Sequence, residues 1–280
     1  MRSNESSTKN LQGKIIQMKQ MVLKYIEMLG ASVLDLLLGL GGFTNYTLKT
    51  IFWTFKPPYR WRLLFDQLYF IGNKSIFIIF LTSSFTGAVF AFQIYVGMKV
   101  INADSFIGPI VTIALAKELA PVLSGLVVAG RCGAAMAAQI GSMKVTEQVD
   151  ALEVMGINSY QYLAVPRIVG ATLSLPLLSG IFLLIGYGGA WLIGTKVIQI
   201  DEAIFSSKIS DFMNLGMVAE GLIKAAVFGY LIGLIGTFHG FAVTGGAEGV
   251  GKGTNLAVVW GMITVLVVDF FLTSFLTKIL

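Results

Sequence analysis

Five long apolar stretches constrain the fold of this chain more than any other feature. A helix crosses the hydrocarbon core of about 30 Å with about 20 residues, each rising 1.5 Å. Five stretches meet that length, at about residues 75–98, 107–140, 162–194, 214–241 and 254–279. Only 12% of the residues are charged, whereas a soluble domain carries about 25%. We therefore predict an all-α polytopic membrane protein, and a soluble enzyme is excluded.

The N-terminal region is basic and amphipathic. Residues 1–74 hold ten of the 20 Lys and Arg residues, against four acidic residues. From Leu11 onward, apolar residues recur at helical spacing with lysines between them, which predicts an amphipathic helix lying in the membrane interface. A sixth span at about residues 28–52 is the alternative; Asp35 and a glycine cluster speak against it.

Basic residues near span ends usually face the cytoplasm. The rule predicts a cytoplasmic N-terminus and an outward, periplasmic C-terminus for five spans. The segments 142–160 and 244–253 then face the cytoplasm as well. The intervening segment WTFKPPYRWR, residues 53–62, combines aromatic and basic residues that suit the level of the lipid head groups. The clustering of positive charge beside the membrane also argues against nucleic acid as the partner.

Four charged residues fall inside the predicted spans: Lys117, Glu118, Lys224 and Asp269. Each costs about 2.5–3.5 kcal/mol at the centre of a membrane helix. Counting residues from the span ends places them in one layer, where they either pair with each other or form the polar floor of a substrate cavity. Pro121 lacks a backbone N–H and therefore frees the carbonyl group of Lys117.

The polar segment SMKVTEQVDALEVMG, residues 142–156, predicts a short cytoplasmic helix ending at Gly156. Apolar residues are expected on one side, and Asp150 and Glu153 on the other. Such a helix suits docking into a groove of a soluble partner. A helix that merely connects two spans is the alternative.

Several kinds of chemistry find no support in the sequence. One cysteine, Cys132, and one histidine, His239, exclude an internal disulfide and a multi-ligand metal site. Residues 246–253 approach a phosphate-binding loop, but Gly253 stands where the loop needs Ser or Thr, and a span precedes it instead of a strand. We expect this chain to bind no metal, nucleotide or other cofactor, and to be no enzyme by itself.

The long run KELAPVLSGLVVAGRCGAAMAAQIGSMKVTEQVDALEVMG resembles the MlaE/YrbE family of lipid-transport permeases. Further matches are YLAVPR, GLIKAAVFG, GGAEGVGKGT and VVDFFLT. The resemblance covers about residues 60–280. It divides the chain into a basic tail with an interfacial helix, residues 1–60, and an MlaE-like permease domain, residues 61–280.

The resemblance implies the permease subunit of an ATP-driven lipid transporter. Members of that family work as homodimers between a cytoplasmic ABC ATPase, which uses ATP and Mg²⁺, and an MCE-domain protein on the outer side. Some also have a STAS-domain regulator. The implied substrate is lipid, commonly phospholipid, moved between the inner membrane and the outer envelope. The implied location is the bacterial inner membrane, with a chloroplast envelope as the less favoured alternative.

The resemblance also implies roles for individual residues. Lys117, Glu118, Lys224 and Asp269 match the intramembrane charges of the family, and Arg131 matches a basic residue near the cytoplasmic end of the second span. The coupling helix that docks the ATPase corresponds to residues 143–156. Its matching residues are Thr146, Glu147, Asp150, Ala151, Leu152, Glu153 and Gly156.

Two other functions stay open at this stage. An ion-coupled secondary transporter would use Glu118, Lys224 and Asp269 as a proton relay. A membrane scaffold for the MCE ring would transport nothing. The predicted docking helix and the lack of an ATPase motif in this chain favour the ATP-driven permease.

Overall fold

The computed structural model describes residues 24, 30, 34, 37–101, 103–276 and 278, and all regular secondary structure within them is helical. This confirms the all-α prediction. The chain divides into two compact units, residues 1–49 and 50–280. In the first unit, residues 37–49 are helical. The amphipathic helix predicted from Leu11 lies almost wholly outside the described residues.

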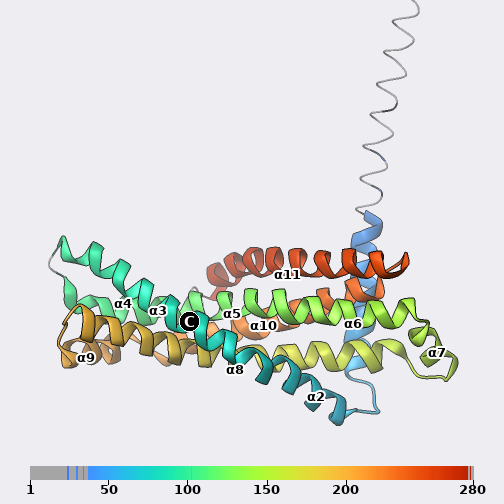
Figure 1. Cartoon of the computed structure of the whole chain (residues 1–280), viewed down its shortest axis with the longest axis horizontal. Coiled ribbons are helices and arrows are strands. Elements are labelled where there is room, and N and C mark those ends of the chain that lie inside the picture. The colour runs from blue at the N-terminus through green and yellow to red at the C-terminus, as the bar shows by residue number, and fades with distance from the viewer. Residues whose placement is uncertain are drawn as a thin grey trace, which may run out of the picture. The chain divides into compact units, whose positions relative to one another are not determined.

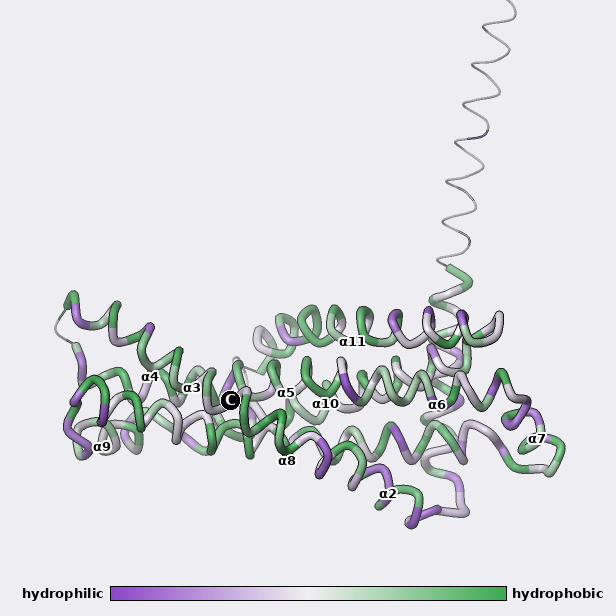
Figure 2. Tube along the Cα trace, viewed as in Figure 1, coloured by the Kyte–Doolittle hydropathy of each residue, from purple (hydrophilic) through white to green (hydrophobic). Residues whose placement is uncertain are grey.

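Five helical segments of the described chain are long and apolar enough to cross a membrane, which confirms the predicted number. They extend over Trp61–Lys99, Asp104–Val145, Tyr160–Val197, Leu215–Phe241 and Gly246–Leu276. Most are longer than a bilayer requires. Figure 2 shows hydrophobic residues along these helices and hydrophilic residues gathered at α7, Gln148–Val154.

The first three segments contain bends and changes of helix type. Their elements are α2 (Trp61–Ile71), a 3₁₀ turn (Asn73–Ser75), α3 (Ile76–Lys99), a second 3₁₀ turn (Asp104–Phe106), α4 (Ile107–Ala114), the π-helical turn η3 (Leu115–Leu119), α5 (Ala120–Val128), the π-helical turn η4 (Ala129–Gly133), α6 (Ala134–Val145), the π-helical turn η5 (Tyr160–Ala164), α8 (Val165–Leu192) and the π-helical turn η6 (Ile193–Val197). The fourth and fifth segments are the single helices α10 (Leu215–Phe241) and α11 (Gly246–Leu276).

Within the second unit, α10 is the central helix and packs against α8, α11 and α6. Small residues permit this close approach. A Cβ atom at Gly229 of α10 would lie closer to the carbonyl oxygen of Ala171 in α8 than helix packing tolerates. The short helices α7 and α9 (Glu202–Phe212) lie at opposite ends of this bundle (Figure 1). We call these the α7 end and the α9 end.

The structure corrects two expectations about the connecting segments. Residues 244–253, expected as a glycine-rich loop, are helical from Gly246 onward. Gly245 and Gly246, with φ of +84° and +73°, form the turn that starts α11, and an ion pair of 2.7 Å between Glu248 and Lys252 spans its first turns. Residues 196–213, expected as a polar connection, contain α9.

Candidate functional site

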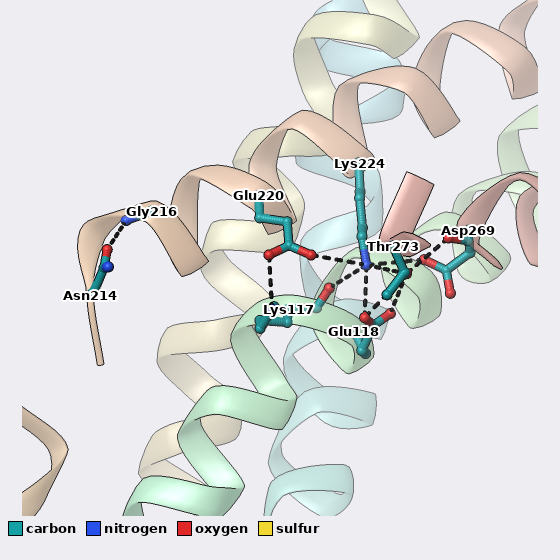
Figure 3. A network of polar contacts seen from close by, with 8 residues as sticks. All are labelled: Lys117, Glu118, Asn214, Gly216, Glu220, Lys224, Asp269 and Thr273. Atoms are coloured by element: carbon teal, nitrogen blue, oxygen red, sulfur yellow. Dashed lines mark hydrogen bonds and ion pairs between the residues drawn. The ribbon is translucent and has the colours of Figure 1, made fainter. Parts of the chain in front are cut away.

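A network of charged side chains joins three helical segments inside the bundle (Figure 3). It contains all four intramembrane charges predicted from the sequence, together with two residues that the prediction missed. We call it the charge network. Its members are Lys117, Glu118, Glu220, Lys224, Asp269 and Thr273.

Lys224 of α10 is the centre of the charge network and is fully buried. Its Nζ donates hydrogen bonds to Thr273 Oγ1 at 2.7 Å, to Glu118 Oε1 at 2.8 Å and to the carbonyl oxygen of Lys117 at 3.1 Å. An ammonium group has three donors, so these bonds use all of them. Asp269 Oδ1, at 3.5 Å from the same Nζ, is held by charge alone.

The backbone of the second segment is shaped to serve this lysine. Pro121 has no N–H, and η3 hydrogen-bonds Ala120 to Leu115 instead of to the residue four positions back. The Lys117 carbonyl is therefore free of the helix ladder and accepts from Lys224, which agrees with the prediction from the sequence. Gly221 allows the approach, because a Cβ atom there would collide with the Ala116 carbonyl oxygen.

Glu220 is the member that matters most among those the sequence prediction missed. Its Oε2 lies 3.1 Å from Lys117 Nζ, and its Oε1 lies 3.8 Å from Lys224 Nζ. The sequence signal was present, since Glu220 precedes Lys224 by four residues on one helix. With Glu118 and Asp269, three carboxylates face two ammonium groups, whereas the sequence prediction counted two of each.

Burial divides the charge network into a closed part and an open part. Glu220 and Lys224 are 2% and 0% exposed, whereas Glu118 is 38% exposed and Asp269 is 20% exposed. Lys117 is also partly exposed. Two buried carboxylate atoms, Glu220 Oε1 and Asp269 Oδ1, accept no hydrogen bond from the described residues. The network therefore offers unused acceptors, and one edge of it is accessible from outside the bundle.

Arg131, the other predicted site residue of this segment, lies in η4 and apart from the charge network. It is 13 residues beyond Glu118, or roughly 20 Å along the helix. Its Nη1 donates to Ser75 Oγ at 2.7 Å, and its guanidinium lies 5.4 Å from the ring centre of Phe70. Within the described chain Arg131 forms no ion pair, so its charge is held by neutral groups.

The segment 143–156, predicted as one short helix, contains the end of α6 and the separate helix α7, and the faces of α7 differ from the prediction. Val149 is buried and Leu152 packs beside it. Val154 and Met155 are 89% and 66% exposed. The apolar residues expected on one side are thus divided, with Val149 and Leu152 inside and Val154 and Met155 outside. Ala151 is also exposed on the outer side of the helix.

The polar residues around α7 have distinct roles. Thr146 Oγ1 donates a hydrogen bond of 2.9 Å to the Ser142 carbonyl oxygen. Glu147, the residue before α7, has a left-handed backbone with a φ of 59°. Glu153 accepts a hydrogen bond of 2.7 Å from Ser159, which fixes the turn that follows. Asp150 is exposed. Gly156 ends the turn with a φ of +75°, a conformation that favours glycine.

Comparison with known proteins places these features in a family. The family model described as Permease MlaE matches residues 64–275. A probable ABC transporter permease protein of Rickettsia bellii is 36% identical over 259 residues, which cover 92% of this chain and 100% of the relative.

Two further relatives carry more specific names. The intermembrane phospholipid transport system permease protein MlaE of Haemophilus influenzae is 33% identical over 91% of this chain and 98% of its own length. The chloroplastic protein TRIGALACTOSYLDIACYLGLYCEROL 1 of Arabidopsis thaliana is 35% identical over 79% of this chain and 63% of its own length. With a family match over most of the chain, five candidate membrane spans and relatives named as transporter permeases, this multi-pass membrane protein belongs to the MlaE permease family.

Proposed function

We propose that this chain is the permease subunit of an ATP-driven lipid transporter with phospholipid as its substrate. It works as a homodimer in the inner membrane of a bacterium, with its N-terminus in the cytoplasm. A separate ABC ATPase, with ATP and Mg²⁺, binds at the α7 end, and an MCE-domain protein binds at the α9 end. A STAS-domain regulator on the ATPase is compatible with this assembly. The name of the Haemophilus influenzae relative, a phospholipid transport permease, supports the proposal.

One observation carries the choice of substrate: the open edge of the charge network adjoins an apolar surface. Asp269 and Thr273 belong to α11, whose other exposed residues are mostly large and apolar. These residues are Leu256, Val259, Trp260, Ile263, Leu266, Val267, Phe270, Phe271 and Phe275. A phospholipid has the matching composition, because its acyl chains require apolar walls and its charged head group requires polar partners.

The same surface supports the homodimer. An apolar face of this size on one helix needs either lipid or protein against it. A second copy packed against the first along α11 would enclose a cavity between two charge networks. Ligand sites commonly lie at such interfaces. The cavity would be wide enough for two acyl chains, which the interior of a single tightly packed bundle is not.

Transfer of lipid between vesicles tests the role of the open edge. The purified complex is reconstituted with its ATPase and MCE partners, and transfer of a fluorescent phospholipid is followed with and without ATP. Glu118→Gln keeps a hydrogen-bond acceptor for Lys224 but removes the charge at the open edge. We expect it to reduce ATP-dependent transfer by about tenfold, the effect of one lost charge-assisted contact.

Glu220→Gln is the matched control, because it makes the same chemical change in the closed part of the charge network. We expect Glu220→Gln to lower the melting temperature while retaining most of the transfer in folded protein. Equal transfer by both variants would contradict a substrate role for the open edge. Transfer that needs no ATP and follows a pH gradient would instead support the ion-coupled alternative.

Docking of the ATPase is proposed at the exposed side of α7. Val154 and Met155 supply apolar anchors there, and Asp150 lies beside them. Val154→Asp and Asp150→Lys should each reduce co-purification of the ATPase, because a short helix offers few anchors. Glu153→Gln is the control, since its side chain bonds to Ser159 and should leave co-purification unchanged. Normal recovery of the ATPase with Val154→Asp would refute this site.

A further inference from the structure

A second polar site lies at the α7 end, in a cavity that shares no residue with the charge network. The cavity has a volume of about 150 Å³ and lies between residues 53–64 and residues 161–169. We call it the linker pocket. We call residues 53–60, which lead into α2, the linker. Gln161 closes one side of the pocket by donating a hydrogen bond of 2.6 Å to the Lys56 carbonyl oxygen, which ties the linker to η5, just before α8.

Two cations line the linker pocket, and aromatic rings hold both of them. Lys56 Nζ lies 4.7 Å from the ring centre of Trp53, and the Arg60 guanidinium lies 4.6 Å from that of Tyr162. A cation above a ring still has its N–H groups available for an acceptor. No acidic residue is among the described residues that line this pocket. The site is therefore positive, and no acidic residue of its described lining neutralises that charge.

Arg60 also has a buried donor with nothing to bond. Its Nε is enclosed and has no hydrogen-bond partner among the described residues. A buried donor left without an acceptor is unfavourable, so this position favours an acceptor atom beside Arg60. The N-terminus of α2 adds to this, because Arg60 is its N-cap, no side chain caps it, and its first turn holds no acidic residue.

The remaining walls indicate what kind of anion fits. Pro58, Leu64, Val165 and Pro166 make most of the lining apolar, and Trp61 borders the cavity. Trp and Tyr beside Arg and Lys are typical of the head-group level of a membrane. A phosphate group joined to a glycerol backbone meets both requirements, with its oxygens on the cations and its carbon chain on the apolar wall.

We propose that the linker pocket binds the phosphodiester of a phospholipid head group from the leaflet at the α7 end. The bound lipid neutralises Lys56 and Arg60 and fixes the linker that leads into α2. The site is separate from the open edge of the charge network, so the proposal depends on the membrane location of the chain and not on lipid transport.

Lipid binding to the full-length chain in detergent micelles tests this site. Native mass spectrometry measures the apparent affinity for added phosphatidylglycerol. Arg60→Gln should weaken binding about tenfold, as expected for loss of a charge-assisted contact. Arg62→Gln is the matched control, because Arg62 carries the same charge two residues away, is exposed and does not line the pocket. It should change the affinity less than twofold.

A second measurement locates the lipid in protein that keeps Arg60, and Arg60→Lys serves as its comparison. Trp53 and Trp61 line the linker pocket, and Trp191→Phe with Trp260→Phe leaves them as the only tryptophans of the chain. Phosphatidylglycerol with bromine near its glycerol end should quench their fluorescence at low lipid ratios. Arg60→Lys keeps the charge but lacks the buried Nε donor. In this variant the brominated lipid should quench the fluorescence at intermediate lipid-to-protein ratios.

The outcomes separate clearly. An unchanged affinity for Arg60→Gln, or an equal loss for Arg62→Gln, overturns the proposal. If inorganic phosphate displaces the lipid at equal concentration, the pocket is a site for free phosphate and the lipid proposal is wrong. If Arg60→Gln loses lipid binding but keeps ATP-dependent transfer, the result supports a binding site outside the transport route. If Glu118→Gln loses transfer but keeps this lipid binding, the proposal for the linker pocket also stands.

Discussion

Two π-helical turns of the same membrane segment hold their cations in opposite ways. In η3, the side chain and the freed backbone carbonyl of Lys117 join a network of three carboxylates around the buried Lys224. In η4, Arg131 bonds to a hydroxyl group and lies over an aromatic ring, with no carboxylate partner in the described chain. A π-helical turn is an uncommon irregularity that often marks functional positions.

The difference shows what a buried charge requires at each place. Lys224 is completely removed from solvent, and only full charges repay the cost of that burial. Arg131 is partly exposed, so the dipoles of neutral groups suffice. The first arrangement is rigid and vulnerable to any single change. The second should tolerate substitution, because the groups around Arg131 are uncharged when it is removed.

The largest expected effect separates the two turns most clearly. Lys224→Met leaves Glu118, Glu220 and Asp269 facing each other without their central cation. Breaking a buried ion pair on one side costs about 3–5 kcal/mol. We expect a large fall in the free energy of unfolding, or protein that fails to accumulate in the membrane. Reversible unfolding in mixed micelles measures it, and wild-type stability would contradict the central role of Lys224.

Adding Asp269→Leu to Lys224→Met tests whether the charge network is one pair or several. An isolated pair replaced by two apolar residues should be close to wild type in stability. Here Glu118 and Glu220 remain, and among the described residues Lys117 is the one other cation that pairs within the network. We therefore expect the double variant to recover less than half of the lost stability. Full recovery in the same unfolding measurement would reduce the network to a single Lys224–Asp269 pair.

Arg131→Met should have a smaller effect, in keeping with the neutral environment of η4. Ser75 loses the guanidinium but keeps its own hydrogen bond of 2.6 Å to the Ile71 carbonyl oxygen. We expect a loss of about 1.5–3 kcal/mol, the value of hydrogen bonds made by a charged donor. Arg131→Met that destabilises the protein as much as Lys224→Met would remove the distinction between the two turns.

The smallest effect is expected outside the membrane. Lys252 forms an ion pair with Glu248, and both side chains are more than 70% exposed. Exposed pairs contribute little to stability. Lys252→Ala should leave the melting temperature and the ATPase activity of the assembled complex unchanged. A loss of nucleotide binding, measured with a fluorescent ATP analogue, would revive the phosphate-loop interpretation of residues 246–253.

Features that depend on local order along the chain could be predicted from the sequence. The five spans follow from length and hydropathy, because apolar stretches of this length are stable as helices in the hydrocarbon core of a bilayer and not in water. The free carbonyl of Lys117 follows from Pro121, three residues after Glu118. The common level of Lys117, Glu118, Lys224 and Asp269 follows from counting along straight helices of known rise.

The pairs of side chains that meet could not be predicted in this way, since they depend on how each helix is rotated against its neighbours. Thr273 joins Lys224 from 49 residues away, and Glu220 meets Lys117 on another helical segment, and no local pattern specifies either contact. The rotation of α7 divides its apolar residues between inside and outside. Arg60 faces Tyr162 because the linker folds back onto the start of α8. Packing at a few backbone contacts sets these rotations, and with them the charge network, the docking surface and the linker pocket.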